Sequence, residues 1–313
     1  MFKKNDYISV VVPVFNNAES LSELNDRICK TLSQIKFIKG SEIIYTNDGS
    51  TDNSHKQLLL IKKNNESKVK IRVIDLMGNH GQQNATFAGL FNASGNVMIT
   101  LSADLQDPPE IISRMYSTYK KNNSIVVAIR SKRNDSLIRK IGSRIVYGLA
   151  NRSNPEIPKF GFDIIMFEKK VMEFIFSKKQ ILALSQLHII ETGLPISYID
   201  YEPQKRKYGK SEWNIKRLVS ASSEILNYYL ISFARHSIYL GTFFIILSIT
   251  IFCLILIGYV SGELPFQGFA LIAGLIIFFG GFIMSTVGAI FVLVSKQYYK
   301  KLPKNSFLIR SIS

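Results

Sequence analysis

The sequence predicts an α/β domain with a mainly parallel sheet, followed by two helices that span a membrane. Over roughly the first 210 residues, short runs rich in Val and Ile alternate with longer amphipathic runs, which is the pattern of successive strand and helix units. Two later runs contain no Asp, Glu, Lys or Arg, and the mean hydropathy of +0.13 is high for a chain with 20% charged residues.

The predicted strands are short and rich in β-branched residues: Tyr7–Val14, Glu42–Thr46, Lys70–Leu76, Val97–Leu101 and Ser124–Ile129. The predicted helices lie between them and show helical spacing of apolar residues: Ala18–Ile38, Asn53–Asn64, Gln82–Ala93 and Pro109–Lys121, the last with Pro at its first turn. No linker or repeat divides this region. We therefore expect one domain, with helices covering both faces of the sheet.

The two charge-free runs are Ser237–Val260 and Phe269–Val294, and each exceeds the roughly 20 apolar residues that a helix needs to cross about 30 Å of hydrocarbon. Trp213 and later aromatic residues before the first run predict an amphipathic helix at the membrane interface. A helix that packs on the domain is the alternative. The expected organisation is, in order, a domain over 1–210, a juxtamembrane helix region over 211–236, a transmembrane hairpin over 237–294 and a basic tail over 295–313.

The flanking charges predict the orientation, because Lys and Arg near a span stay in the cytoplasm. Lys and Arg are frequent from Lys205 to Arg235 and again after the second span, whereas the connector "SGELPFQG" has none. We expect a multi-pass protein of the inner (plasma) membrane with its domain and both termini in the cytoplasm. Nothing at the N-terminus resembles a signal peptide. Cys29 and Cys253 are the only cysteines, so no disulfide framework is expected.

The net charge of +16 is compatible with binding of nucleic acid or of anionic lipid. Attraction to anionic lipid is worth about 1 kcal/mol per juxtamembrane Lys or Arg. On a chain with two predicted spans we favour the membrane and an anionic substrate, and we expect no nucleic-acid partner.

Polar clusters follow the first four predicted strands: "PVFNN", "NDGSTDNS", "GNHGQQ" and "SADLQDPP". Ligands of such sheets bind beyond the carboxyl ends of the strands, so the clusters are expected to share one site. Asp48 is a candidate for hydrogen bonds to a nucleoside, with Asn17 on the same rim, although Asp-Gly is also an ordinary turn signal. The spacings of a zinc site, of a dinucleotide site and of a P-loop are absent from the sequence.

Asp104 and Gln106 alternate after the fourth strand and are expected to point to one side, whereas Asp107 is expected to face away and cap the next helix. Hard cations such as Mg²⁺ take oxygen ligands and often need only one or two carboxylates beside substrate phosphates. Two basic segments, around Arg130 and Arg206, are candidate phosphate-binding groups; a solvated charged face is the alternative.

The chain resembles the family-2 inverting polyprenyl-phosphate glycosyltransferases, which include dolichol-phosphate mannose synthase and bacterial bactoprenol glucosyltransferases. The resemblance is carried by "VVPVFNNAESL", "NDGSTDNS", "NHGQQNATFAGLFNASG", "ADLQDPPE", "GFDIIMFEKKV" and "RKYGKSEWNIKRL", followed by two spans. It implies a GT-A fold that transfers a sugar with inversion from a nucleoside diphosphate, with UDP expected, to a polyprenyl phosphate such as undecaprenyl phosphate. The product would be a lipid-linked sugar donor for cell-envelope glycans such as O-antigen.

The resemblance also implies roles for individual residues, by group. The nucleotide-binding residues would be Pro13, Phe15, Asn17, Asp48 and Gln82, and the ligands of Mg²⁺ or Mn²⁺ would be Asp104 and Gln106. The residues that contact phosphate or the acceptor would be Arg130, Arg133, Arg139, Arg206, Lys210 and Ser211. Asp104 and Asp163 would form the catalytic pair, with Asp163 orienting or deprotonating the acceptor; support of the fold is the alternative role for Asp163.

This sequence departs from the family pattern at four positions. Ser102 replaces the first acidic residue of the D-x-D pattern, so reduced metal affinity is expected, and Glu212 replaces a Lys whose phosphate contact Lys210 would have to supply. Asn17 replaces a Glu, and Gly78 replaces an Arg. The competing functions are a non-catalytic membrane adaptor that retains the fold and a synthase with a sugar acceptor. The Gly-rich run "GLIIFFGG" suggests close helix packing, so a homo-oligomer is possible.

Overall fold

The computed structural model describes residues 6–122, 125–131, 162, 164–177, 187–190, 192–205, 207–208, 215–262, 268–301 and 307–313. The chain forms two compact units, Met1–Ile215 together with Pro303–Ser313, and Lys216–Leu302. The first unit contains the sheet and the second contains two long helices.

The first unit has the following elements in chain order: β1 Asp6–Val14, α1 Leu21–Gln34, β2 Ile38–Asn47, α2 Ser54–Lys63, β3 Lys70–Leu76, α3 Gln82–Phe91, β4 Val97–Thr100, α4 Ile111–Asn122, β5 Ile125–Arg130, β6 Ile164–Glu168, α6 Lys169–Ser177, α7 Leu187–Ile190, β7 Ile196–Tyr201 and β8 Ile309–Ile312. The strands form one eight-stranded sheet in the order β7-β5-β6-β4-β1-β2-β3-β8. Only β6 and β8 pair antiparallel to their neighbours within this sheet, so the expected mainly parallel arrangement is confirmed.

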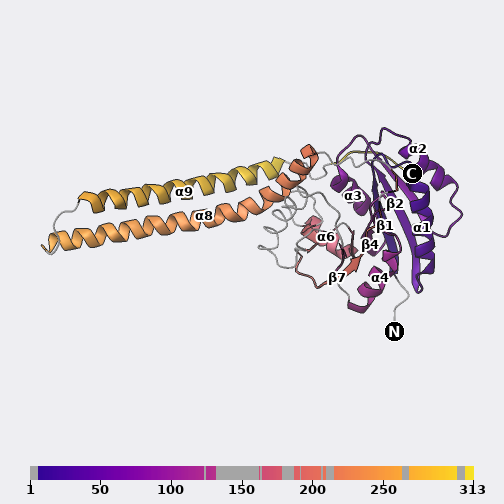
Figure 1. The fold of residues 1–313 in the computed structure, drawn as a ribbon, viewed down its shortest axis with the longest axis horizontal. Coiled ribbons are helices and arrows are strands. Elements are labelled where there is room, and N and C mark those ends of the chain that lie inside the picture. The colour runs from indigo at the N-terminus through magenta and orange to yellow at the C-terminus, as the bar shows by residue number, and fades with distance from the viewer. Residues whose placement is uncertain are drawn as a thin grey trace. The chain divides into compact units, whose positions relative to one another are not determined.

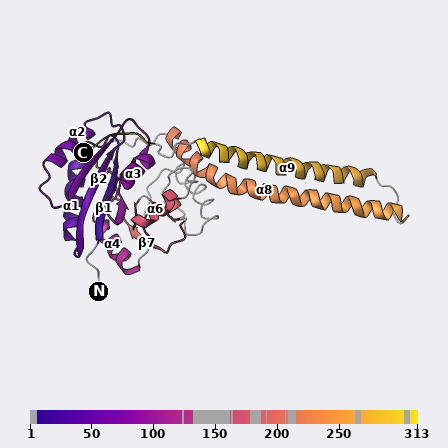
Figure 2. The same cartoon turned by 180° about the vertical axis from the view of Figure 1, so that it is seen from behind.

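Helices cover both faces of the sheet, as Figures 1 and 2 show. Apolar residues of α1, α2 and α4 pack in one core cluster with alternate residues of the strands, such as Val10, Val12 and Tyr45. Helix α3 lies on the other face, against β1 and β2, and α6 packs on β6. β1 is buried along almost its whole length because it has a neighbour on each side and helices above and below.

The strands β1 to β5 lie within a few residues of their predicted positions, whereas the helix predicted over 18–38 is shorter. It ends at Gln34 because Ile35 has an extended backbone and Phe37 has a φ of 67°, and the chain then enters β2. The prediction was too long because Ile35 and Ile38 continue the helical spacing of apolar residues, although the backbone is no longer helical there.

The chain order of the strands reverses next to β1, because β1, β2 and β3 run outward in one direction and β4 returns to the other side of β1. Six strands, β1 to β5 and β7, run in parallel, so their carboxyl ends share one edge of the sheet. Ligands of open α/β sheets bind at this edge, where the strand order reverses. The fold therefore brings together the polar clusters predicted to form a site.

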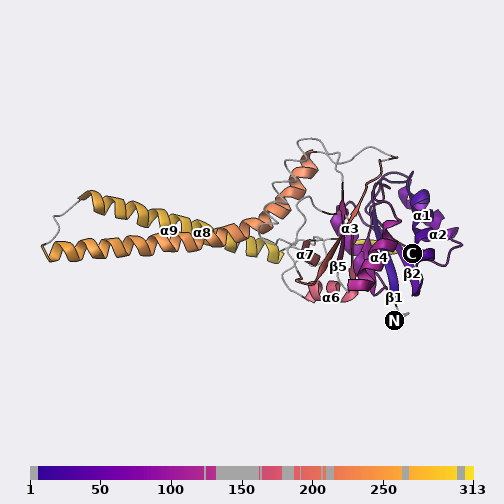
Figure 3. The same ribbon diagram turned by 60° about the horizontal axis from the view of Figure 1, so that its bottom comes forward.

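The second unit is a helical hairpin of α8 Ile215–Val260 and α9 Gly268–Lys301, which run alongside each other in Figure 1 and cross in the view of Figure 3. Each contains a 28-residue stretch apolar enough to cross a membrane, Phe233–Val260 and Gly268–Ser295, and only 11% of each most apolar window is buried. The helices approach closely at Gly241 and Gly281, where a Cβ on Gly281 would lie 2.7 Å from the Gly241 carbonyl oxygen. Helix α8 joins the predicted juxtamembrane segment and the first predicted span without a break.

Candidate functional site

The predicted nucleotide-binding residues lie in the loops that follow β1, β2 and β3. Asp48 directly follows β2 and is only 2% exposed. Its carboxylate accepts backbone hydrogen bonds from His80 at 2.7 Å and from Gly81 at 2.9 Å, and its own N–H donates to the carbonyl of Val14 at 2.8 Å. Asp48 therefore holds the ends of three adjacent strands in one arrangement.

The loop after β1 is fixed by side-chain to backbone hydrogen bonds. The Asn16 side-chain oxygen accepts from the N–H of Thr51 at 2.9 Å, and the Asn17 N–H donates to the Ser54 hydroxyl at 2.8 Å. Asn16 has a φ of 54°, a left-handed conformation that Asn tolerates better than most residues. Among the other predicted residues, Pro13 is buried, Phe15 is half-buried, and Gln82 is exposed at the first turn of α3. The structure thus places all five predicted nucleotide-binding residues on one edge.

The loop after β4 exposes alternate side chains although it is not a strand. Ser102, Asp104 and Gln106 are partly exposed, whereas the residues between them are buried. Leu105, between Asp104 and Gln106, has a φ of 59°, an unfavourable conformation for a bulky side chain. Asp104 and Gln106 are therefore both accessible, although β4 ends at Thr100 and the strand on which their alternation was expected does not extend to them.

The oxygen groups of this loop fit a hard divalent cation. Asp104 supplies a carboxylate, and Ser102 and Gln106 supply neutral oxygens, which are the ligands that Mg²⁺ and Mn²⁺ accept. Within the described part of the chain, His, Cys, Asp and Glu side chains form no group of three that would hold an ion. A cation at Asp104 would therefore take most of its ligands from substrate phosphates and water.

The side chain of Asp107 does not cap α4, as its position before that helix had led us to expect. Rather than facing away from the site to cap α4, it is fully buried in contact with three residues of the site. Its Oδ1 accepts from the Tyr201 hydroxyl at 2.5 Å and from the Arg130 guanidinium at 3.0 Å, and its Oδ2 accepts from the Ser102 hydroxyl at 2.5 Å. The Ser102 hydroxyl also lies 3.1 Å from Asp104 Oδ1, so Ser102 connects Asp107 to the candidate cation ligand.

Arg130, predicted to bind phosphate, is thus anchored at the end of β5. Its Nη2 pairs with Asp107 and its Nε donates to the Tyr201 hydroxyl at 3.0 Å, while 21% of its side chain stays exposed. Arg130 and Tyr201 are register partners on β5 and β7, so the strand pairing sets this contact. The arrangement keeps one positive charge beside the carboxylates of the β4 loop.

Further contacts join these loops into one site. The Ser20 hydroxyl, at the start of α1, donates to the carbonyl of Ala103 at 2.7 Å and lies 3.0 Å from the carbonyl of Asn17. It therefore links the loop after β1 with the loop after β4. On α1, Arg27 forms a bidentate pair with Glu110 at 2.8 and 2.9 Å, and this pair holds the pKa of the Glu110 carboxyl below its usual value.

Six predicted site residues lie outside the described residues: Asp163, Arg133, Arg139, Arg206, Lys210 and Ser211. The two residues after Arg206 are described, and both contact α1. Lys207 Nζ lies 2.6 Å from Glu23 Oε2, and the Tyr208 hydroxyl donates to the same oxygen at 3.2 Å. Part of the second basic segment thus lies against the helix that begins at the site.

Sequence reasoning missed Ser20 and Tyr201, and it assigned Asp107 to a helix cap. The Ile and Tyr residues of "ISYIDY", which are frequent in strands, were the available signal for a strand at Tyr201. Its pairing with β5 depends on tertiary structure. Ser20 carried no signal beyond its position before a helix, so its bond to Ala103 was not predictable.

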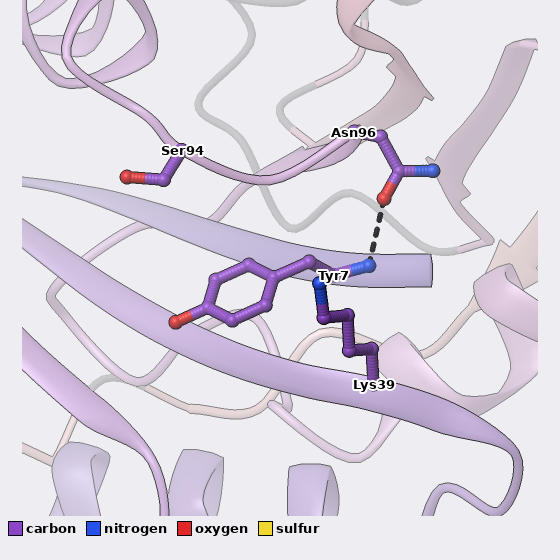
Figure 4. Close-up of a pocket in the computed structure, with 4 residues that line it drawn as sticks. All are labelled: Tyr7, Lys39, Ser94 and Asn96. Atoms are coloured by element: carbon purple, nitrogen blue, oxygen red, sulfur yellow. Dashed lines mark hydrogen bonds between the residues drawn. The ribbon is translucent and has the colours of Figure 1, made fainter. Parts of the chain in front are cut away.

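A separate open pocket of about 480 Å³ lies at the opposite edge of the sheet. Figure 4 shows its lining residues Tyr7, Lys39, Ser94 and Asn96, with the Tyr7 N–H donating to the Asn96 side-chain oxygen at 2.7 Å. These residues lie at the amino ends of β1, β2 and β4. This pocket is therefore distinct from the candidate site at the carboxyl ends.

Comparisons with known proteins show what the whole chain is similar to. Residues 9–178 match the model of the family described as Glycosyl transferase family 2. The chain is 31% identical over 235 residues to an undecaprenyl-phosphate 4-deoxy-4-formamido-L-arabinose transferase of Proteus mirabilis, over 72% of this chain and 68% of that protein. It spans 66% of the length of the transferase of the same name from Yersinia pestis, at 32% identity.

Two other similarities extend over most of the chain. An uncharacterized glycosyltransferase of Synechocystis is 25% identical over 308 residues, which are 97% of this chain and 95% of that protein. The crystal structure of mannosyl-3-phosphoglycerate synthase from Rubrobacter xylanophilus has a TM-score of 0.50 at 14% identity and covers 74% of each chain. This structural likeness bears on the fold alone and confirms the GT-A-like sheet.

Proposed function

Because this chain belongs to glycosyl transferase family 2, we propose that it transfers a sugar from a nucleoside diphosphate to a polyprenyl phosphate in the membrane, with inversion at the anomeric carbon. The chain is a glycosyltransferase, and related transferases are named for undecaprenyl phosphate as acceptor. The observation that carries the proposal is the position of Asp104. It is accessible in the loop after β4, and the loop of Asp48 follows β2 on the other side of β1 at the same edge of the sheet.

The donor would lie along the common edge of the sheet. The loops after β1 and β2, ordered by Asp48, would hold the nucleoside, with UDP the expected nucleotide. The diphosphate would then reach the β4 loop, where Asp104, Gln106 and Ser102 would hold Mg²⁺ or Mn²⁺. When bound, such a cation stabilises the charge on the departing diphosphate. Arg130, fixed by Asp107, would add a positive charge on the same side.

The transfer itself is a single displacement. An oxygen of the acceptor phosphate bonds to the anomeric carbon while the bond from that carbon to the diphosphate oxygen breaks, and the electron pair leaves with the nucleoside diphosphate. A phosphate monoester has a second pKa of about 6, so the acceptor is already largely dianionic at neutral pH. Positioning of the two substrates therefore contributes more than proton removal. We assign that orienting role to Asp163, with Arg133, Arg139, Arg206, Lys210 and Ser211 as acceptor contacts.

The hairpin of α8 and α9 would anchor the domain where a lipid phosphate is available. The chain enters the helical unit from the unit that contains the sheet and returns to that unit after α9. This connectivity supports two crossings of the membrane, with both ends of the hairpin on the same side. The basic residues that flank the spans favour the cytoplasmic side of the inner membrane. The lipid-linked sugar would serve modification of a cell-envelope glycan.

The test uses purified full-length protein with a panel of sugar nucleotides, undecaprenyl phosphate and Mg²⁺ or Mn²⁺, and mass spectrometry of the lipid product. We expect transfer from at least one UDP-sugar and loss of that transfer in Asp104→Asn, with an unchanged melting temperature. Asp26→Asn, an exposed position on α1, is the matched control and keeps full activity. Full activity in Asp104→Asn contradicts the assigned role. A folded protein that turns over none of the donors would favour the adaptor function.

A further inference from the structure

The last residues of the chain return to the sheet after the second long helix. β8 pairs antiparallel with β3, and Ser313 and Val73 exchange backbone hydrogen bonds of 2.8 and 2.9 Å. The Met77 N–H donates to the carbonyl of Leu308 at 2.9 Å, and the side chain of Phe307 is buried. Figure 1 marks the C-terminus beside α2 at this edge. The segment 307–313 therefore contains an edge strand of the sheet, β8, and is fixed on both sides of it.

A side chain of β8 also reaches a buried carboxylate of β3. Arg310 Nη1 lies 3.2 Å from Asp75 Oδ2, and the Asp75 side chain is 5% exposed. Asp75 Oδ1 accepts from the Asn47 side-chain amide at 2.7 Å. Asn47 is the last residue of β2 and directly precedes Asp48. Arg310 thus lies beside a buried carboxylate that contacts the residue before Asp48, and His55 Nδ1 lies 3.4 Å from the other oxygen of that carboxylate.

A backbone hydrogen bond of the segment before β8 also connects it to the loop of Asp48. Met77, held by Leu308, begins the turn whose N–H groups at His80 and Gly81 bind the carboxylate of Asp48. That turn is tightly packed, because a Cβ on Gly49 would lie 2.5 Å from the carbonyl carbon of Gly78. Without β8, the end of β3 would be an open sheet edge with unpaired backbone groups.

We propose that the C-terminal strand is a positioning element for donor binding, with Arg310 as its positioning residue. Through Asp75 and Asn47 on one side and Leu308 and the turn after β3 on the other, β8 sets the position of the loop that holds the nucleoside. This inference rests on the proposed function in that the bound group is a nucleoside diphosphate. Neither Arg310 nor Leu308 contacts the substrate in this proposal.

The experiment compares Arg310→Gln, Arg310→Lys and a chain that ends at Phe307 with the full-length protein. Ser311→Ala, an exposed change on the same strand, is the matched control. Because the Arg310 side chain is 61% exposed, its ion pair is a weak one, and we expect Arg310→Gln to raise the donor KM and the Kd of UDP about twofold to fivefold while kcat is unchanged. Arg310→Lys should recover at least half of the loss, and the shortened chain should lose more than tenfold in UDP affinity.

Hydrogen exchange supplies a readout that does not depend on transfer. We expect faster exchange of the amides of residues 77–81 in Arg310→Gln and in the shortened chain, with exchange in β1 and β4 unchanged. A failure of the wild type to use any sugar nucleotide removes the proposed function but leaves this exchange result valid for the loop. Unchanged exchange at 77–81 overturns the inference, and so does an increase spread over β1 and β4, which indicates a role in global stability alone.

Discussion

Substitution of Tyr201 by Phe tests whether the buried carboxylate of Asp107 organises the site. The Tyr201 hydroxyl lies 2.5 Å from Asp107 Oδ1 and accepts from Arg130 at 3.0 Å, and the Asp107 side chain has no solvent exposure. Loss of a hydrogen bond to a charged group costs about 1.5 to 3 kcal/mol. For a domain of this size, each kcal/mol shifts the melting temperature by about 2–4 °C, so we expect a decrease of roughly 3–12 °C.

The assay is thermal unfolding of the detergent-solubilised full-length protein, followed by circular dichroism. Tyr198→Phe is the matched control, because Tyr198 lies on the same strand with 43% exposure, and its melting temperature should change by less than about 2 °C. Ser102→Ala removes a second donor to Asp107. Since both substitutions act on one carboxylate, their effects should be non-additive by about 0.5 kcal/mol or more.

Two results would refute this reasoning. Equal melting temperatures for Tyr201→Phe and Tyr198→Phe would mean that the hydroxyl contact with Asp107 carries no stability. Strict additivity of Tyr201→Phe and Ser102→Ala would mean that the two donors do not share the carboxylate in solution.

Two further predictions concern acid stability and metal affinity. Burial raises the pKa of Asp6, but hydrogen bonds from Lys120 and two neutral donors outweigh burial and hold the pKa below 3.8, so its contribution to stability is present above about pH 3.8 and lost as the pH falls further. Between about pH 5 and about pH 3, the melting temperature of Asp6→Asn should therefore decrease less than that of the wild type. An identical decrease in both proteins would contradict this assignment. Ser102→Asp should raise Mn²⁺ affinity about tenfold in calorimetry without nucleotide, since it adds a carboxylate beside Asp104, and should lower the melting temperature in EDTA by repulsion from Asp107. Unchanged Mn²⁺ affinity would place the cation elsewhere.

The sequence predicted the parallel half of the sheet well because those strands are buried on both faces and alternate with helices. It also predicted that Asp48 and Asp104 share an edge, since that follows from strand direction alone. It did not predict β6, which lies antiparallel between β4 and β5, because pairing order leaves no trace in a short apolar run. The network around Asp107 was missed for the same reason, since it depends on the register of β5 with β7.

The assignments of Asp163 and of the acceptor-binding basic residues remain predictions, since they lie outside the described residues. The C-terminal strand had no signal in the sequence either. "LIRSIS" is too short and too polar to indicate a strand, and its partner β3 lies more than 200 residues earlier in the chain, with Arg310 and Asp75 235 residues apart. Local patterns predict elements, whereas contacts over long separations arise from the assembled fold.

The pairing of β8 with β3 has a consequence for biosynthesis. Arg310 and Asp75 are 235 residues apart, and the two long helices lie between them in the chain. A ribosome makes both helices before it makes the last strand, so the sheet can be completed only after the hairpin has left the ribosome. The edge strand that we propose orders the Asp48 loop is thus made only after both long helices, and a chain that terminates within either helix would lack it.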